Sequence, residues 1–545
     1  MEQPGVGEDD SAPVPGTAVA ILESAHAVRS ERERTAGAAT HDGRSGAPDA
    51  RPTGLPPRVE LLGVVLLGLQ LVAMVVFSAV EYHRFALTRD FATYAQAWSA
   101  IGHGALDPRS SIVGVPFWQN NAEFAMWPLA LLYHLYPHPV TLLWVQDLAV
   151  VATELVTFRW ISQVVARHDG VLSSRARATI GVAAAVALVA NPWVYETIAF
   201  DFHFEALAAL FAVLVARDVW TGRAGRLRWW VPLALACDAF GAVYLVGVGI
   251  SAVLAGCRTR RTGALLVAGG GAWLVLLTII GALGVGGSGL KVAYGYLVGP
   301  HQGRIGPLDV VAGALTHPGS VAHAVASHVP VVLGLLVSVG LIGLFSSWGI
   351  GMAAVVLLPN ILDGSGLFLR YAASFQSWPA LPFVLVGSVM VVLRLRQRGE
   401  WGRRAVGALA STWVAVAGVL AAIVIPTVLP DWVAVDPAAA AVLARSEPAI
   451  APNAEVIASQ GIVGRFAERA SVHDFGSEGQ TFPVEAHTVV FVLSVHQGVA
   501  DAFAGSGTAI GFVRTQLHAA ELRSGAGVYV FDWTPPPNTA TVTLP

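Results

Sequence analysis

The chain is poor in charged residues, in lysine and in cysteine. Only 13% of its 545 residues are charged, whereas an ordinary soluble domain carries about 25%. So little charge cannot cover the surface of a soluble protein of this length, which excludes a soluble enzyme and a disordered scaffold. Lys291 is the one lysine, and Cys237 and Cys257 are the two cysteines. Both cysteines fall in or beside one apolar block, which argues against a disulfide framework and a thiolate metal site.

The abundant residues are apolar, at 54% of the chain, and they gather in blocks of about the length that crosses a bilayer. The pattern predicts a polytopic α-helical membrane protein with about 11 spans. We expect the spans at residues 59–80, 141–162, 179–197, 203–217, 229–240, 241–256, 263–284, 329–346, 349–363, 378–394 and 405–428. The segment 229–256 is expected to be a hairpin of two short helices, because Asp238 lies near its middle. The apolar stretch 124–137 is short and is expected to be interfacial or re-entrant.

Arginine placement predicts the orientation. Four arginine-rich loops fall on the same side under these spans, which is the cytoplasmic side by the positive-inside rule. They are residues 164–178, 216–228, 257–262 and 394–404. The N-terminus is then cytoplasmic, in a bacterial plasma membrane. The long loops 82–140 and 285–328, the loop 364–377 and the C-terminal tail face outward.

The domain organisation follows from these boundaries. Residues 1–57 are polar and contain no apolar signal-peptide core, so we expect a disordered cytoplasmic segment. Residues 58–428 form the membrane domain, and 429–545 a small extracytoplasmic α/β domain. In that domain the pattern predicts strands at 454–459, 471–475, 488–494, 508–513 and 527–533, and helices at 460–467 and 497–504.

Acidic residues at the outer membrane boundary are the first candidates for chemistry, because charge there is costly and long outer loops are usually functional. Asp90 begins an expected amphipathic helix on the outer leaflet, with Phe91, Tyr94, Ala95, Trp98 and Ile101 on one face. The alternative role for Asp90 is a helix N-cap. Glu123 precedes the re-entrant stretch and completes the outer acidic set.

Further ionisable groups lie in or beside the predicted spans. Asp201, His203 and Glu205 fall within five residues of one another, in a turn between two apolar helices. Asp238 lies inside the hairpin. Asp201, His203 and Asp238 could instead cap helix ends, whereas Glu205 would lie inside the next span and need a partner or a proton. Arg370, and more weakly Lys291 and Arg304, are outer cations suited to a phosphate. Arg370 could instead extend to lipid headgroups.

Three segments carry a resemblance to a known family. They are RDFATYAQAW, with Asp90, Tyr94, Gln96 and Trp98; FDFHFEAL at 200–207; and IASQGIVGRFAER at 457–469. Over most of residues 60–535, the chain resembles a family of bacterial multi-pass membrane proteins placed in the GT-C superfamily of integral membrane glycosyltransferases. That family usually has His-Phe where this chain has Glu123-Phe124. It often has Lys-Glu before the aspartate where this chain has Ala236-Cys237, and often His-Tyr where this chain has Phe375-Gln376.

The resemblance implies a GT-C-like fold and sugar transfer at the outer face, from a polyprenyl-phosphate-linked donor to an envelope glycan, lipid or protein. It implies that Asp90 is the general base. Arg370, Arg304 and Lys291 would then meet the donor phosphate. The pocket, which would bind the acceptor or a divalent metal such as Mg or Mn, would be formed by Asp201, His203, Glu205, Asp238, Tyr94, Gln96 and Glu123. The net charge of −3 gives no indication of a nucleic-acid partner.

Two other functions stay open. A transporter or lipid flippase would use Glu205 and Asp238 as coupling groups, although the sequence shows none of the repeated halves typical of transporters. A non-catalytic scaffold in envelope assembly is favoured by the polar groups that the family has and this chain lacks.

Overall fold

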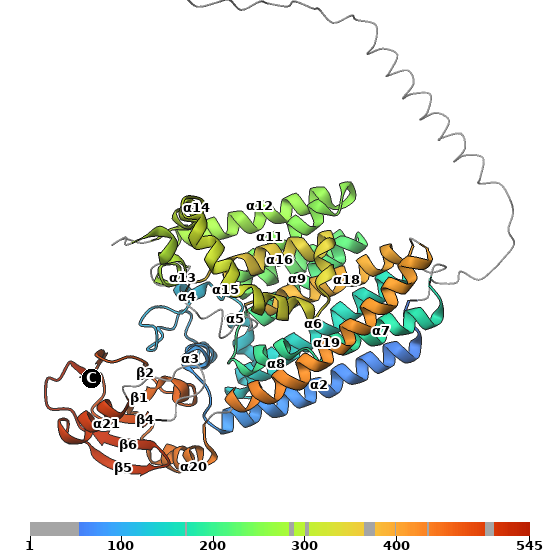
Figure 1. The fold of residues 1–545 in the computed structure, drawn as a ribbon. Helices are drawn as coiled ribbons and strands as arrows, with labels where there is room; N and C mark the ends of the chain where they lie inside the picture. Colours follow the sequence, from blue (N-terminus) through green and yellow to red (C-terminus); the bar gives the residue numbers. More distant parts are fainter. Residues whose placement is uncertain are drawn as a thin grey trace, which may run out of the picture. The chain divides into compact units, whose positions relative to one another are not determined.

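The computed structural model describes residues 54–168, 172–282, 288–299, 305–364, 376–397, 399–432, 435–495 and 506–545. Within these ranges the chain first forms a set of apolar helices and then a small sheet domain (Figure 1). Residues 1–53 of the segment that is predicted to be disordered lie outside the described residues.

The membrane part consists of long helices joined by short turns, with irregular segments at one end. The longer helices are α2 (Pro57–His83), α6 (Val140–Ala166), α7 (Ser174–Val189), α8 (Pro192–Ala199), α9 (Glu205–Thr221), α10 (Leu227–Cys237), α11 (Ala239–Leu254), α12 (Cys257–Ile279), α15 (Pro318–Val337), α16 (Ser347–Ile361), α18 (Leu381–Arg396) and α19 (Glu400–Trp432). The shorter elements are α3 (Arg89–Gly102), α4 (Trp118–Asn121), α5 (Met126–Leu129), η2 (Ala130–His134), η3 (Ala224–Arg226), α13 (Ser288–Val298), α14 (Pro307–Thr316), η4 (Leu341–Phe345) and η5 (Trp378–Ala380).

The predicted count of about 11 spans is not confirmed. Six helical segments of the described chain are long and apolar enough to cross a membrane: Pro57–His83, Val140–Ala166, Ser174–Ala199, Cys257–Ile279, Pro318–Val337 and Trp378–Arg396. Shorter apolar helices cover Ala239–Leu254, Ser347–Ile361 and Ala410–Ile423. The predicted block at 229–240 becomes α10, which has 11 residues. Since a helix rises 1.5 Å per residue, α10 spans about 16 Å, roughly half of the hydrocarbon thickness.

The predicted break at Asp238 is confirmed. Helix α10 ends at Cys237, and Asp238 takes an extended conformation with φ −168° and ψ −176°. Its side chain then caps α11 by accepting the backbone N–H of Gly241 at 2.7 Å. The stretch 124–137 also forms only the short helices α5 and η2, in keeping with its predicted inability to cross a bilayer.

Large aromatic and aliphatic side chains fill the helix interior. Helix α6 packs against α2, α7, α9 and α18, and α11 packs against α12 and α16. Trp160 on α6 lies fully buried and meets Trp348 edge-on, with ring centroids 5.4 Å apart. Helix α6 thus lies inside the helix set, with α2, α7, α9 and α18 around it.

The C-terminal domain is built on a five-stranded sheet in the order β2-β1-β4-β6-β5. The strands are β1 (Glu455–Ser459), β2 (Val472–Phe475), β4 (Val489–Ser494), β5 (Ala520–Gly525) and β6 (Val528–Trp533), and β3 (Gln480–Pro483) pairs separately with β7 (Thr541–Leu544). Strands β2, β1 and β4 are parallel, while β6 and β5 are antiparallel. The helices are α20 (Pro437–Ser446), η6 (Glu447–Ala449), η7 (Gln460–Phe466) and α21 (Ser506–Thr515).

Four of the five predicted strands are confirmed, as β1, β2, β4 and β6. The predicted strand at 508–513 is wrong, because this segment belongs to α21. Its buried residues Ala509, Ile510 and Val513 are spaced so that they lie on one face of a helix. The predicted helix at 460–467 is the 3-10 helix η7. The predicted helix at 497–504 lies outside the described residues.

Helix α3 is not the surface helix that its pattern predicts, because it is buried on both sides. Phe91, Trp98 and also the polar residues Thr93, Gln96 and Ser99 are buried. One side packs against α5 and η2, and the other against η7 of the C-terminal domain. At this contact the backbone N–H of Gly464 donates to the carbonyl oxygen of Leu87 at 2.9 Å.

We predict that Gly464→Ala weakens this docking. A Cβ atom at residue 464 would lie 2.6 Å from the Cβ of Leu87 and 2.9 Å from its carbonyl oxygen. Overpacking of this kind costs about 1–3 kcal/mol. The measurement is the apparent melting temperature of the purified full chain, which should fall. Gly511→Ala on α21 is the control, since a Cβ there meets nothing within 4 Å. Equal melting temperatures for both variants would contradict the docking.

Candidate functional site

Asp201 binds the first turn of α3 from a distant part of the chain. It lies between α8 and α9, in the left-handed region at φ 51°. Its carboxylate accepts the backbone N–H of Thr88 at 3.0 and 3.2 Å, the hydroxyl of Thr88, and the N–H of Phe91 at 3.3 Å. These are among the N–H groups that a helix start leaves without intrahelical partners. Asp201 therefore fixes where α3 begins.

Thr88, and not Asp90, is the N-cap of α3. The Thr88 hydroxyl oxygen accepts the backbone N–H of Asp90 at 3.3 Å. The N-cap alternative for Asp90 is therefore wrong. The carboxylate of Asp90 lies in the first turn of α3 and is not the capping group.

Gln146 on α6 holds the turn that carries Asp201. Its amide nitrogen donates to the carbonyl oxygen of Asp201 at 2.6 Å, and its amide oxygen accepts the backbone N–H of His203 at 2.6 Å. The side chain of Gln146 is 1% exposed. One buried amide thus connects α6 to both residues of the turn.

His203 faces Asp90. Its Nε2 lies 3.6 Å from the carboxylate of Asp90, with side chains 5% and 44% exposed respectively. The other ring nitrogen, Nδ1, lies 3.1 Å from the carbonyl oxygen of Phe200. A carbonyl can only accept, so Nδ1 carries a proton and donates to it. This contact orients the ring toward Asp90.

The two aspartates differ in their electrostatic surroundings. Asp90 keeps part of its surface open but lies among densely packed atoms, and this burial alone would raise its pKa. The polar contact with His203, the charge of His203 and the charge of Arg89 outweigh burial, so that the pKa of Asp90 lies below its ordinary value. For Asp201, burial dominates and raises the pKa to about 6, although the hydrogen bond from Thr88 lowers it. Asp90 is therefore ionised at neutral pH.

Tyr94 and Glu123 form a second polar contact beside this pair. The hydroxyl of Tyr94 donates to Glu123 at 2.8 Å, and Glu123 is 1% exposed. The Tyr94 ring meets Phe202 and Phe204 edge-on at 5.3 and 5.8 Å, and its centroid lies 5.9 Å from that of His203. The two predicted motifs on α3 and in the turn before α9 are thus packed together.

Glu205 and Asp238 complete the acidic group at the starts of α9 and α11. Glu205 interacts electrostatically with Asp238, Glu123 and Asp90. Both side chains are buried, at 6% and 2% exposed. The backbone N–H of Ala125 donates to the carbonyl oxygen of Ala236 at 2.6 Å, which joins the Glu123 segment to the break before α11. We use the name Asp90 cluster for Asp90, Tyr94, Glu123, Asp201, His203, Glu205 and Asp238.

Gln96, which is predicted to line the pocket, bonds residues outside the Asp90 cluster. Its amide nitrogen donates to the hydroxyl of Ser111 at 2.8 Å and to the carbonyl oxygen of Arg469 at 3.4 Å. Ser111 in turn donates to the carbonyl oxygen of Val472 on β2 at 2.7 Å. Gln96 therefore attaches the C-terminal domain to α3.

Of the three residues that are predicted to contact the donor phosphate, the structure describes only Lys291. Arg304 and Arg370 lie outside the described residues. Lys291 is exposed on α13, and no hydrogen bond or ion pair within the described chain joins it to the Asp90 cluster. The structure instead shows a cation that the sequence analysis missed. Arg89 directly precedes Asp90, is 40% exposed, and lies 3.5 Å from Asp474 on β2.

A metal ligand set is not found in the described part of the chain. Across residues 54–168, 172–282 and the later described ranges, no three His, Cys, Asp or Glu side chains lie close enough together to hold a metal ion. The divalent metal therefore stays a prediction.

Comparisons with known proteins give one family match and a distant structural likeness. The family described as "Predicted membrane protein (DUF2079)" matches residues 86–511. The crystal structure of ArnT from Cupriavidus metallidurans bound to undecaprenyl phosphate is similar at a TM-score of 0.45 and 14% identity. That match covers 85% of this chain and 97% of ArnT. No curated protein matches the chain.

We predict that Asp201→Asn loosens the start of α3. An asparagine places an NH₂ group among donors, so one or more hydrogen bonds from Thr88 and Phe91 are lost, at a cost of about 1–2 kcal/mol. Backbone amides at residues 88–93 should exchange with deuterium faster. Asp436→Asn is the matched control, because Asp436 caps α20 by accepting the N–H of Ala438 at 2.6 Å. Its effect should stay within α20, and unchanged exchange in α3 of Asp201→Asn would refute the anchoring role.

Proposed function

The chain belongs to the DUF2079 family of predicted membrane proteins, and from this premise we propose that it is a membrane glycosyltransferase. It moves a sugar from a polyprenyl-phosphate-linked donor to an acceptor of the cell envelope, at the outer face of a bacterial plasma membrane. One observation supports this most directly. Asp90 is a partly exposed, ionised carboxylate paired with His203, seven residues after α2 ends at His83.

The geometry suits Asp90 to act as the general base. An acceptor hydroxyl attacks the anomeric carbon of the sugar, the new glycosidic bond forms, and the bond from that carbon to the phosphate oxygen breaks. The hydroxyl proton passes to the Asp90 carboxylate, and the polyprenyl phosphate leaves with the bonding electrons. His203 orients the carboxylate and keeps it ionised before the step.

The leaving phosphate needs positive charge nearby. Arg89 is adjacent to Asp90, and its only ion pair within the described chain is the 3.5 Å contact with Asp474. Asp474 is buried, but the guanidinium of Arg89 carries five N–H donors and is 40% exposed, so it can keep this contact and still donate to a phosphate. We assign Arg89 to the donor phosphate. The predicted contacts of Lys291, Arg304 and Arg370 remain part of the proposal.

The remaining carboxylates of the Asp90 cluster suit a sugar pocket. Glu123, Glu205 and Asp238 are buried oxygen acceptors, and sugar hydroxyls are donors. The Oδ2 atom of Asp238 is buried and has no hydrogen-bond partner in the described chain. We propose that sugar hydroxyls supply the missing hydrogen bonds. The C-terminal domain, which covers α3, would then bind the acceptor.

A transporter or lipid flippase is the second candidate, because the helices contain buried carboxylates that sugar transfer does not use. Glu81 on α2 and Asp147 and Glu154 on α6 are at most 1% exposed. Ionisable groups inside membrane helices often mark proton or ion pathways. Lipid movement across reconstituted vesicles in the absence of sugar transfer would favour this function.

We predict that Asp90→Asn abolishes sugar transfer. The full chain in lipid nanodiscs is mixed with a panel of polyprenyl-phosphate sugars and envelope extracts, and donor consumption is followed by mass spectrometry. Loss of a general base lowers the rate by about a hundredfold to ten-thousandfold. Asp107→Asn is the matched control, since Asp107 is an exposed carboxylate of the same outer loop that bonds Trp118 instead. Turnover by the Asp90 variant at the normal rate would rule it out as the base.

We predict that His203→Gln shifts the acid limb of the pH–rate profile to higher pH. His203 supplies the largest lowering influences on the pKa of Asp90, and without them burial raises it. Wild-type activity therefore persists at pH values where the variant has lost its ionised base. The variant should recover as the pH rises. A loss that is equal at every pH would mean that His203 acts only structurally.

A further inference from the structure

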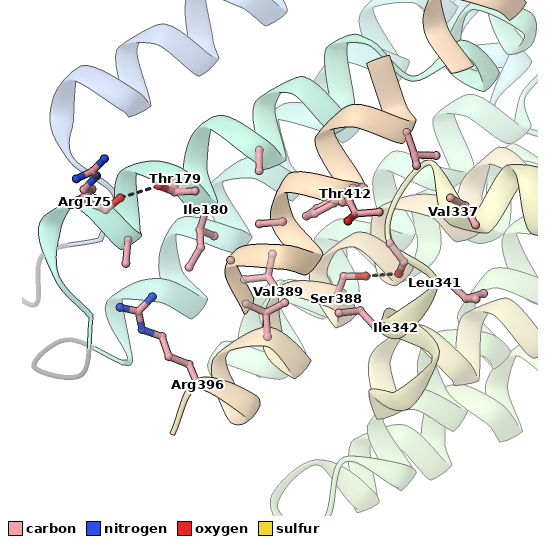
Figure 2. A pocket seen from close by; sticks show the side chains of 18 of the residues that line it. Arg175, Thr179, Ile180, Val337, Leu341, Ile342, Ser388, Val389, Arg396 and Thr412 are labelled. Atoms are coloured by element: carbon pink, nitrogen blue, oxygen red, sulfur yellow. Dashed lines mark hydrogen bonds between the residues drawn. The ribbon is translucent and has the colours of Figure 1, made fainter. Parts of the chain in front are cut away.

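A second, apolar site lies between α7, α18, α19 and η4. It is a cavity of about 530 Å³, within the size range of pockets that enclose small molecules (Figure 2). Its lining is mainly aliphatic and includes Ala176, Ile180, Val389, Val392 and Val416. An aliphatic groove between helices of a membrane protein suits a hydrocarbon chain, since lipid tails are what surround such helices.

One end of this groove is cationic. Arg175 on α7 and Arg396 at the end of α18 both line it, and Figure 2 shows them at the same end of the groove. The Nε atom of Arg396 is buried and has no hydrogen-bond partner among the described residues. The first turn of α7 begins at the same place, after its N-cap Ser173, and adds the positive end of a helix dipole. Together these groups form a site for an anion.

This end and the Asp90 cluster lie at opposite ends of one candidate membrane span. Arg175 is at the start of the segment Ser174–Ala199, which is a candidate membrane span of 26 residues, and Asp201 follows its end. At 1.5 Å per residue, α7 with its 16 residues alone extends about 24 Å, and α8 follows it before Asp201. The groove is therefore separate from the proposed donor site. Arginine placement predicts that its cationic end faces the cytoplasm.

We propose that the groove binds an anionic phospholipid, with the phosphate between Arg175 and Arg396 and one acyl chain along the aliphatic lining. Guanidinium groups bind phosphate oxygens in a bidentate way, and basic pockets between membrane helices select anionic headgroups. A zwitterionic lipid carries an ammonium group that two arginines disfavour. Charge complementarity therefore identifies the occupant as anionic.

The test uses native mass spectrometry of the full chain in neutral detergent, titrated with dioleoyl phosphatidylglycerol or dioleoyl phosphatidylcholine. Wild type should retain one phosphatidylglycerol molecule more tightly than phosphatidylcholine. The double variant Arg175→Gln/Arg396→Gln should bind phosphatidylglycerol at least about tenfold more weakly, because two charged contacts with the phosphate are lost. Its affinity for phosphatidylcholine should change little.

Two further variants separate the groove from general surface charge. Ala176→Phe fills the cavity and should weaken binding of both lipids, with the apparent melting temperature checking that the protein still folds. Arg260→Gln/Arg261→Gln is the matched charge control, because both arginines are exposed on α12 and outside the groove. Equal binding of the two lipids by wild type, an equal loss in this control, or unchanged binding by a folded Ala176→Phe protein would each overturn the proposal.

Discussion

The hydrogen bonds from the start of α3 to the carboxylate of Asp201 connect two segments more than a hundred residues apart. The carbonyl oxygen of Asp201 accepts a hydrogen bond from Gln146 of α6, whose side chain is buried, so the start of α3 is attached to the helix interior. Because α3 carries Asp90 and Tyr94, and the Asp201 turn carries His203, this contact brings the pairs Asp90–His203 and Tyr94–Glu123 together. The geometry of the Asp90 cluster depends on it.

The buried state of α3 explains how an amphipathic helix at the membrane boundary becomes part of a site. Its polar side chains, which would otherwise face water, bond the C-terminal domain through Gln96 and Ser111. Arg89 reaches the same domain through Asp474, while Asp90 keeps part of its surface open. A carboxylate that is partly accessible and ionised at neutral pH can accept the proton of a hydroxyl group that binds beside it.

Local patterns predicted the features that depend on local sequence. The length of the apolar blocks predicted apolar helices, and the isolated Asp238 predicted the break before α11. The apolar runs of the C-terminal domain predicted four strands of its sheet. The motifs around Asp90 and Asp201 identified side chains that do meet. Contacts over long sequence separation were not predictable in this way. The bond from Gln96 to Arg469 spans 373 residues and is one of the contacts that bury α3 against the C-terminal domain. The role of Arg89 likewise depends on where β2 lies.

The most direct measurement is an electron cryomicroscopy structure of the full chain in a lipid nanodisc with a polyprenyl-phosphate sugar bound. The account predicts that the donor phosphate lies beside Arg89 and that the anomeric carbon of the sugar faces the Asp90 carboxylate, with sugar hydroxyls toward Glu123, Glu205 or Asp238. A donor phosphate bound away from Arg89, with Asp90 closed off from the sugar by protein side chains, would contradict it.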